Sequence, residues 1–175
     1  MTVINPSDRI SGLEKDFGKL SRIQKVLLFT DGSITASLDV LYGKTKISVL
    51  SQKTVKSDAR IAELLNIKEC EEVNFRTVII HKENMPLIYA ESYAPQERLN
   101  EDFKKELMAS EAGIGRIIKT QNVETRREIL SVNTERCENE SFKSGQKLLL
   151  SRTYRIISGG KSLVWIKEIF SPNIR

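Results

Sequence analysis

Histidine, tryptophan, cysteine and proline are scarce in this chain of 175 residues, which contains one histidine, one tryptophan, two cysteines and four prolines. The single histidine, His81, cannot form a histidine cluster. This argues against a zinc site and against Ser-His or Cys-His catalysis. Acid–base chemistry is therefore expected from carboxylates, lysine, tyrosine or arginine-assisted water.

Long apolar runs and ligand-like cysteine spacings are also missing. No stretch approaches the roughly 18 apolar residues that a membrane span requires. The N-terminal segment lacks a signal-peptide core, so we expect a cytoplasmic protein without a membrane partner. Cys70 and Cys137 lie far apart in the sequence. Two ordinary thiols are expected, with a disulfide or a reactive thiol as alternatives.

The formal net charge is +5, but 28 lysines and arginines are dispersed among 23 acidic residues. The densest basic pairs, Lys104-Lys105 and Arg126-Arg127, each adjoin a glutamate, and aromatic residues do not interleave with them. A nucleic-acid-binding face combines clustered cations with stacking aromatics, so no nucleic-acid partner is expected. A small anionic ligand suits this mildly basic chain. The sequence does not indicate an oligomeric state.

Hydrophobic spacing predicts one α+β domain over residues 1–175, built on an antiparallel sheet, with a helical extension over 1–20. Apolar residues three and four apart predict helical segments at 10–27, 33–42, 57–67, 96–108 and 110–118. Runs rich in β-branched and aromatic residues predict strands at 46–55 and 122–132 and hairpins at 70–95 and 147–170.

Polar interruptions predict where these elements begin and end. The residues TDGS break an apolar pattern, with Ser33 as the N-cap of a helix that stops at Gly43. Ser110 is a candidate cap for a shorter helix. Gly159-Gly160 suits the positive φ angles of a tight hairpin turn.

Two charged residues interrupt strands whose neighbours are apolar. Glu168 shares its predicted strand face with Val164 and Ile166, and Arg76 shares its face with Val78. A buried ion is costly unless it is paired. One reading is that Arg76 and Glu168 pair with each other or with other side chains and hold the sheet in register. The other is that Arg76 binds a carboxylate and Glu168 handles a proton.

Arg155 is a second candidate cation. If Gly159-Gly160 forms a two-residue turn, Ser151 falls opposite Glu168, and Arg155 then shares the face of Glu168. A register slip of one residue would turn Arg155 away.

Five segments together resemble the chorismate pyruvate-lyase family, in particular its archaeal and bacterial branch. They occur in the family's order from about residue 24 onwards and read LLFTDGSIT, FRTVII, PLIYAESYAP, GIGRII and KEIFSP. The resemblance implies a central antiparallel sheet with helices and flaps that enclose a ligand cavity. It also implies cleavage of chorismate to 4-hydroxybenzoate and pyruvate without a metal or cofactor.

The resemblance assigns roles to four residues. Arg76 matches an arginine that grips the ring carboxylate, and the backbone N–H groups of Ile34 and Ile114 match flap positions that assist it. Glu168 matches a glutamate that contacts the ring hydroxyl. The polar interruption before Ile34 is then both a turn and a ligand contact, because the first N–H groups of a helix lack intrahelical partners.

Glu91 departs from the family pattern, because it stands where well-studied members carry an arginine. A carboxylate cannot hold the enolpyruvyl carboxylate, so another cation such as Arg155 or Arg116 takes this role, or the ligand is a different chorismate-like acid. A function of another class is also open. The same superfamily contains effector-sensing domains that bind small anions without reacting them, but no DNA-binding helix-turn-helix precedes this region, so an enzyme is expected first.

Overall fold

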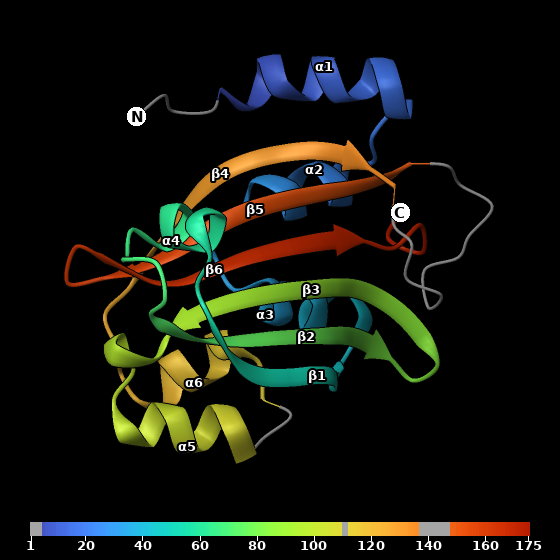
Figure 1. Cartoon of the computed structure of the whole chain (residues 1–175). Helices are drawn as coiled ribbons and strands as arrows, with labels where there is room; N and C mark the ends of the chain where they lie inside the picture. Colours follow the sequence, from blue (N-terminus) through green and yellow to red (C-terminus); the bar gives the residue numbers. More distant parts are fainter. Residues whose placement is uncertain (1–4, 110–111, 137–147) are drawn as a thin grey trace.

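Six antiparallel strands form one sheet in the order β1-β2-β3-β6-β5-β4 (Figure 1). The computed structural model describes residues 5–109, 112–136 and 148–175. The strands are β1 (Lys46–Lys56), β2 (Glu72–Lys82), β3 (Met85–Pro95), β4 (Arg126–Glu135), β5 (Leu149–Ser158) and β6 (Lys161–Phe170). The predicted α+β class is confirmed, as are both predicted hairpins.

Six α-helices and a short 3-10 helix surround the sheet in the described parts of the chain. They are α1 (Pro6–Phe17), α2 (Arg22–Phe29), α3 (Ile34–Tyr42), α4 (Ala59–Leu65), η1 (Gln96–Arg98), α5 (Glu101–Ala109) and α6 (Ile114–Thr120). In Figure 1, α2 and α3 lie behind the sheet, α4 lies in front of it, and α1 runs beside β4. The two faces of the sheet are therefore covered by different helices.

The helix ends follow the predicted capping residues. The Ser33 hydroxyl accepts a hydrogen bond from Ala36 N at 3.4 Å, and α3 ends at Gly43, whose φ is 77°. Gly18, with a φ of 94°, divides the predicted first helical segment into α1 and α2. Helix α6 begins after Gly113, without a side-chain cap, and Ser110 lies outside the described residues.

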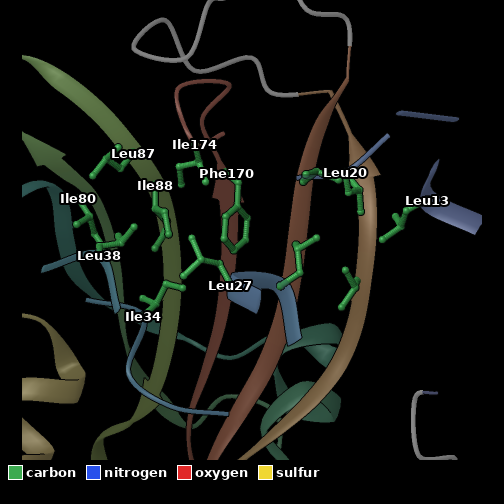
Figure 2. Close-up of a cluster of buried hydrophobic side chains, with 14 of the residues drawn as sticks. Leu13, Leu20, Leu27, Ile34, Leu38, Ile80, Leu87, Ile88, Phe170 and Ile174 are labelled. Carbon is green, nitrogen blue, oxygen red and sulfur yellow. The ribbon is translucent and has the colours of Figure 1, made fainter. Parts of the chain in front are cut away.

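The largest hydrophobic cluster joins α2 and α3 to the centre of the sheet. Leu27 and Leu38 are fully buried and pack with Ile88 and Phe170, as Figure 2 shows. Burying a leucine side chain contributes about 1.5–3 kcal/mol. This packing fixes the end of α2 and the start of α3 against the sheet, so the polar interruption between them has a defined position.

The β5–β6 hairpin contains one extra residue. Ser158 pairs with Lys161 around Gly159-Gly160 as predicted, and both glycines have positive φ angles, 53° and 76°. Beyond this turn the register shifts, because Ile157 pairs with Ser162 and Ile156 with Val164. Leu163 is thus the additional residue of a β-bulge.

The bulge reverses one prediction about the neighbours of Glu168. Arg152, and not Ser151, lies opposite Glu168, and Arg155 lies opposite Trp165. Because side chains alternate along a strand, Arg155 occupies the sheet face opposite to Glu168. The prediction that Arg155 shares the face of Glu168 is wrong.

Candidate functional site

A small cavity lies between one face of the sheet, the start of α3 and residues 112–115. Its volume is about 60 Å³. Its lining includes Ile34, Arg76, Ile114 and Glu168, which are four of the five candidate site residues predicted from the sequence. The other lining residues are Ser33, Thr35, Ile47, Val78, Ile80, Ala90, Ser92, Gly113, Gly115, Arg127, Tyr154, Ile156 and Ile166.

Arg76 lies on β2 and is only 2% exposed. Its Nη1 donates a hydrogen bond to the Ala112 carbonyl at 3.0 Å, which connects the sheet to residues 112–115. Burial lowers the pKa of the Arg76 guanidinium. An arginine in a protein nevertheless keeps its proton, so a positive charge faces the cavity.

Glu168 lies on β6, is 2% exposed, and uses both carboxylate oxygens. Arg152 Nε donates to Oε2 at 2.6 Å, and the Tyr154 hydroxyl donates to Oε1 at 2.9 Å. The ion-pair partner of Glu168 is therefore Arg152.

Arg152 connects this carboxylate to the end of helix α2. It is 1% exposed, and its Nη1 donates to the carbonyls of Leu27 and Thr30 at 2.7 and 2.8 Å. Desolvation opposes the charge of Arg152, but Glu168 and then Tyr154 outweigh it and raise the pKa of Arg152. Arg152 is thus a buried, charged link between the carboxylate and the segment that precedes α3.

Tyr154 keeps its hydroxyl proton. Burial first, and the nearby Glu168 carboxylate second, raise the pKa of Tyr154 above its ordinary value. The protonated hydroxyl can therefore donate to Glu168 across the whole neutral range, and this holds the carboxylate in one orientation.

Arg127 supplies a second guanidinium to the cavity. It lies on β4 opposite Ile156, on the same sheet face as Glu168. Its Nη1 donates to the Asp31 carbonyl at 3.3 Å, and its Nε has no hydrogen-bond partner within the described ranges. Sequence reasoning missed Arg127, because the Arg126-Arg127 pair beside a glutamate resembles a solvated charge cluster. The signal that could have found Arg127 is the alternation of side chains along a strand, which places Arg126 and Arg127 on opposite faces of the sheet.

The start of α3 and residues 112–115 meet closely over the cavity. A Cβ atom placed on Gly113 would lie 2.9 Å from Ile47 Cδ1, and one on Gly115 would lie 3.2 Å from Ser33 Oγ. Glycine at these two positions avoids close contacts with the neighbouring side chains. Ile34 and Ile114, one on each side of this contact, both line the cavity.

Three charged residues considered from the sequence lie elsewhere. Arg155 forms an ion pair with Glu128 at 3.2 Å. Glu91 lies opposite Lys167 on the sheet face that points away from the cavity, and it accepts a hydrogen bond from Tyr89 at 3.1 Å. Arg116 is exposed and lines a groove outside the cavity. Glu91 therefore does not line the cavity.

The remaining sequence features give no further site. Cys70 is an exposed free thiol, and Cys137 lies outside the described residues. Within the described ranges no group of three or more His, Cys, Asp and Glu side chains is placed to hold a metal ion. None of the described helices has the length and apolar character that crossing a membrane requires.

Comparison with solved structures shows a shared fold. The chain superposes on the effector domain of PhnF from Mycobacterium smegmatis with a TM-score of 0.66 and 10% identity, covering 81% of this chain and 90% of that chain. It also superposes on the ligand-binding domain of a putative GntR-family transcriptional regulator from Bordetella bronchiseptica, with a TM-score of 0.62, 14% identity, and 74% and 87% coverage.

Comparison with sequences gives the family. The chain is 34% identical over 171 residues to a protein of Methanocaldococcus jannaschii named "Putative lyase MJ0807", covering 93% of this chain and 84% of that protein. The family model described as "Chorismate pyruvate-lyase Rv2949c-like" matches residues 28–175. This match includes every cavity-lining residue named above. The chain therefore belongs to the Rv2949c-like chorismate pyruvate-lyase family.

Proposed function

We propose that this protein is a chorismate pyruvate-lyase, which eliminates pyruvate from chorismate and leaves 4-hydroxybenzoate. The observation that carries the proposal is the lining of one cavity by two guanidinium groups and a buried carboxylate, from Arg76, Arg127 and Glu168. Chorismate carries two carboxylates and one ring proton that must be removed. The two guanidinium groups match the two carboxylates of chorismate, and the carboxylate of Glu168 matches the proton that must be removed.

Arg76 is assigned to the ring carboxylate. Its guanidinium is buried and hydrogen-bonded to the Ala112 carbonyl, and Ile34 and Ile114 line the same cavity. Ile34 is the first residue of α3, so no intrahelical carbonyl accepts its N–H. Each charge-assisted hydrogen bond from such groups contributes about 1.5–3 kcal/mol.

Arg127 is assigned to the enolpyruvyl carboxylate. This is the role for which the sequence offered Arg155 or Arg116. Arg127 is the better candidate, because it lines the cavity together with Arg76, whereas Arg155 faces the other side of the sheet. Two arginines on separate strands would fix both ends of the substrate.

Glu168 is assigned the role of general base, which removes the ring proton. The Glu168 carboxylate, which Arg152 holds in place, can accept the ring proton from the carbon that bears the hydroxyl. The electron pair of that C–H bond completes the aromatic ring while the neighbouring C–O bond breaks. Enolpyruvate leaves, takes a proton, and becomes pyruvate, so the atoms balance without an oxidant or reductant. A positioned general base contributes roughly 10²–10⁴ in rate.

The test is to incubate the protein with chorismate and follow pyruvate and 4-hydroxybenzoate together. Equimolar formation of both is expected, with Glu168→Gln reducing turnover by roughly 10²–10⁴ and Arg76→Ala abolishing it. Arg126→Ala is the matched control, because the Arg126 side chain is 66% exposed. Normal turnover in Glu168→Gln would remove this residue from the proton transfer.

A second function is favoured by the fold comparison, since the superposed structures are ligand-binding and effector domains. In this alternative the protein binds a small aromatic or cyclohexadienyl acid and does not react it. Chorismate recovered intact, together with tight binding of 4-hydroxybenzoate measured by calorimetry, would favour the sensor over the lyase.

A further inference from the structure

A wide groove lies directly outside the cavity. Its volume is about 760 Å³, and it is lined by parts of α3, the α3–β1 connection, β1, α5 and α6. Five residues line both the groove and the cavity, namely Ser33, Thr35, Ile47, Gly113 and Gly115. The two spaces are therefore neighbours, separated by the contact between the start of α3 and residues 112–115.

The groove collects cations that lack acidic partners. Lys44, Lys46, Arg116 and Lys119 line it, and all four are exposed. In the part of the chain that the structure describes, none of the four forms an ion pair. Gathering like charges without counter-charges is unfavourable, and it produces a positive potential that attracts anions.

Two carboxylates also line the groove, but both are engaged locally. Asp39 accepts hydrogen bonds from the backbone N and the hydroxyl of Thr45 at 2.7 and 2.6 Å. Glu106 accepts hydrogen bonds from Thr120 at 3.3 Å and from Gln121 at 3.2 Å. Both carboxylates keep their charge, so the four cations exceed the carboxylates by two, and the groove lining is net positive.

The cavity itself is too small to admit a ring compound without movement. Its volume of about 60 Å³ compares with at least roughly 300 Å³ for typical small-molecule pockets. The lining residues shared with the groove include Gly115, where an added Cβ atom would lie 3.9 Å from Ser33 Cβ. Separation of Ser33 and Gly115 would join the two spaces.

We propose that this basic groove is an anion-binding antechamber, through which small carboxylate ligands reach the cavity between Ser33 and Gly115. The inference deepens the proposed function and rests on it only for the identity of the ligand. The positive side chains of the groove raise the local concentration of anions and accelerate their arrival. They also repel positively charged molecules of similar size. Such steering weakens as salt shortens the Debye length to about 8 Å at physiological ionic strength.

The test measures which reagents reach the cavity, independently of turnover. In a background with Cys70→Ser and Cys137→Ser, a reporter thiol is placed in the cavity as Ser92→Cys. Its labelling rate is compared for a sulfonate-bearing and an ammonium-bearing methanethiosulfonate of similar size, at low salt. A second reporter, Ala90→Cys, is used in parallel, since both positions are buried and line the cavity.

Charge reversal in the groove gives the decisive comparison. With Arg116→Glu and Lys119→Glu together, the ratio of the labelling rate by the anionic reagent to that by the cationic reagent is expected to fall at least about tenfold. Added salt should reduce the difference in this ratio between the variant and the parent protein. The control with the same change in net charge is Lys68→Glu together with Lys161→Glu, because both residues are exposed and lie outside the groove lining. It should leave the ratio unchanged.

An unchanged ratio in the groove variant, for both reporters, would overturn the antechamber and place the route elsewhere. A change of equal size in the control with Lys68→Glu and Lys161→Glu would also overturn it, because the effect would then reflect net charge alone. Failure of chorismate turnover would not affect either result. The antechamber and the proposed function can therefore fail separately.

Discussion

Arg152 and Glu168 face each other across β5 and β6, with Nε 2.6 Å from Oε2 and both side chains almost completely buried. The pair joins the candidate proton acceptor to two carbonyls at the end of α2. A charge removed from one side of such a pair leaves the other buried and uncompensated.

Removing Arg152 alone is therefore expected to be severe. Arg152→Ala should lower the free energy of unfolding by about 3–5 kcal/mol, as measured by urea denaturation at neutral pH. The double variant Arg152→Met, Glu168→Leu removes both charges and should recover much of this loss. A double variant less stable than Arg152→Ala would contradict the assignment of an uncompensated charge, and Arg126→Ala serves as the surface control.

Arg127 should distinguish substrate from product. Arg127→Ala is expected to reduce kcat/KM for chorismate by about 10- to 100-fold, the loss of one charge-assisted contact, while 4-hydroxybenzoate binding changes little. Arg76→Ala should weaken both. The measurements are steady-state kinetics and calorimetric titration with the product, with Arg126→Ala as control. Equal loss of product binding in Arg127→Ala would refute a separate second-carboxylate site.

The contact between Ser33 and Gly115 can be locked. The two Cβ positions, 3.9 Å apart, suit a disulfide, whose Cβ atoms are typically about 3.8 Å apart. In a background without Cys70 and Cys137, oxidised Ser33→Cys, Gly115→Cys should lose turnover and regain it with dithiothreitol. The single variants control for the loss of the Ser33 cap. Undiminished turnover with the disulfide formed would show that this contact does not need to open.

Tyrosine ionisation provides a test at alkaline pH. Because the pKa of Tyr154 is raised, the folded state keeps its proton where the unfolded chain loses it, so its contribution to stability is present below about pH 10 and declines above that. Removing one of the four tyrosines as Tyr154→Phe should lower phenolate absorbance at pH 11 in urea but not in the native protein. An equal decrease in the native protein would show that Tyr154 titrates while folded.

The prediction from sequence was accurate where local chemistry decides the outcome. Ser33, Gly43 and the glycine pair act through their own backbone and capping preferences, so their positions follow from the residues alone. The inward orientation of Glu168 follows from alternation within a single strand. These features require no knowledge of how distant segments pair.

Features that depend on strand pairing were harder to predict. The bulge at Leu163 adds a residue with no distinctive composition, so Arg152 was not recognised as the partner of Glu168. The face of Glu91 depends on the register of β3 against β6. Arg127 reaches the cavity only because β4 pairs with β5 at the far edge of the sheet.

The extra residue at Leu163 also affects how relatives should be compared. Counting residues from the glycine turn to the buried glutamate assumes an unbroken ladder, which this hairpin does not have. A relative without the bulge would keep the arginine–glutamate pair only if its glutamate came one residue sooner after the turn. An alignment across this hairpin therefore needs a gap at the bulge, or it will match a column of cavity-facing residues with one from the opposite face of the sheet.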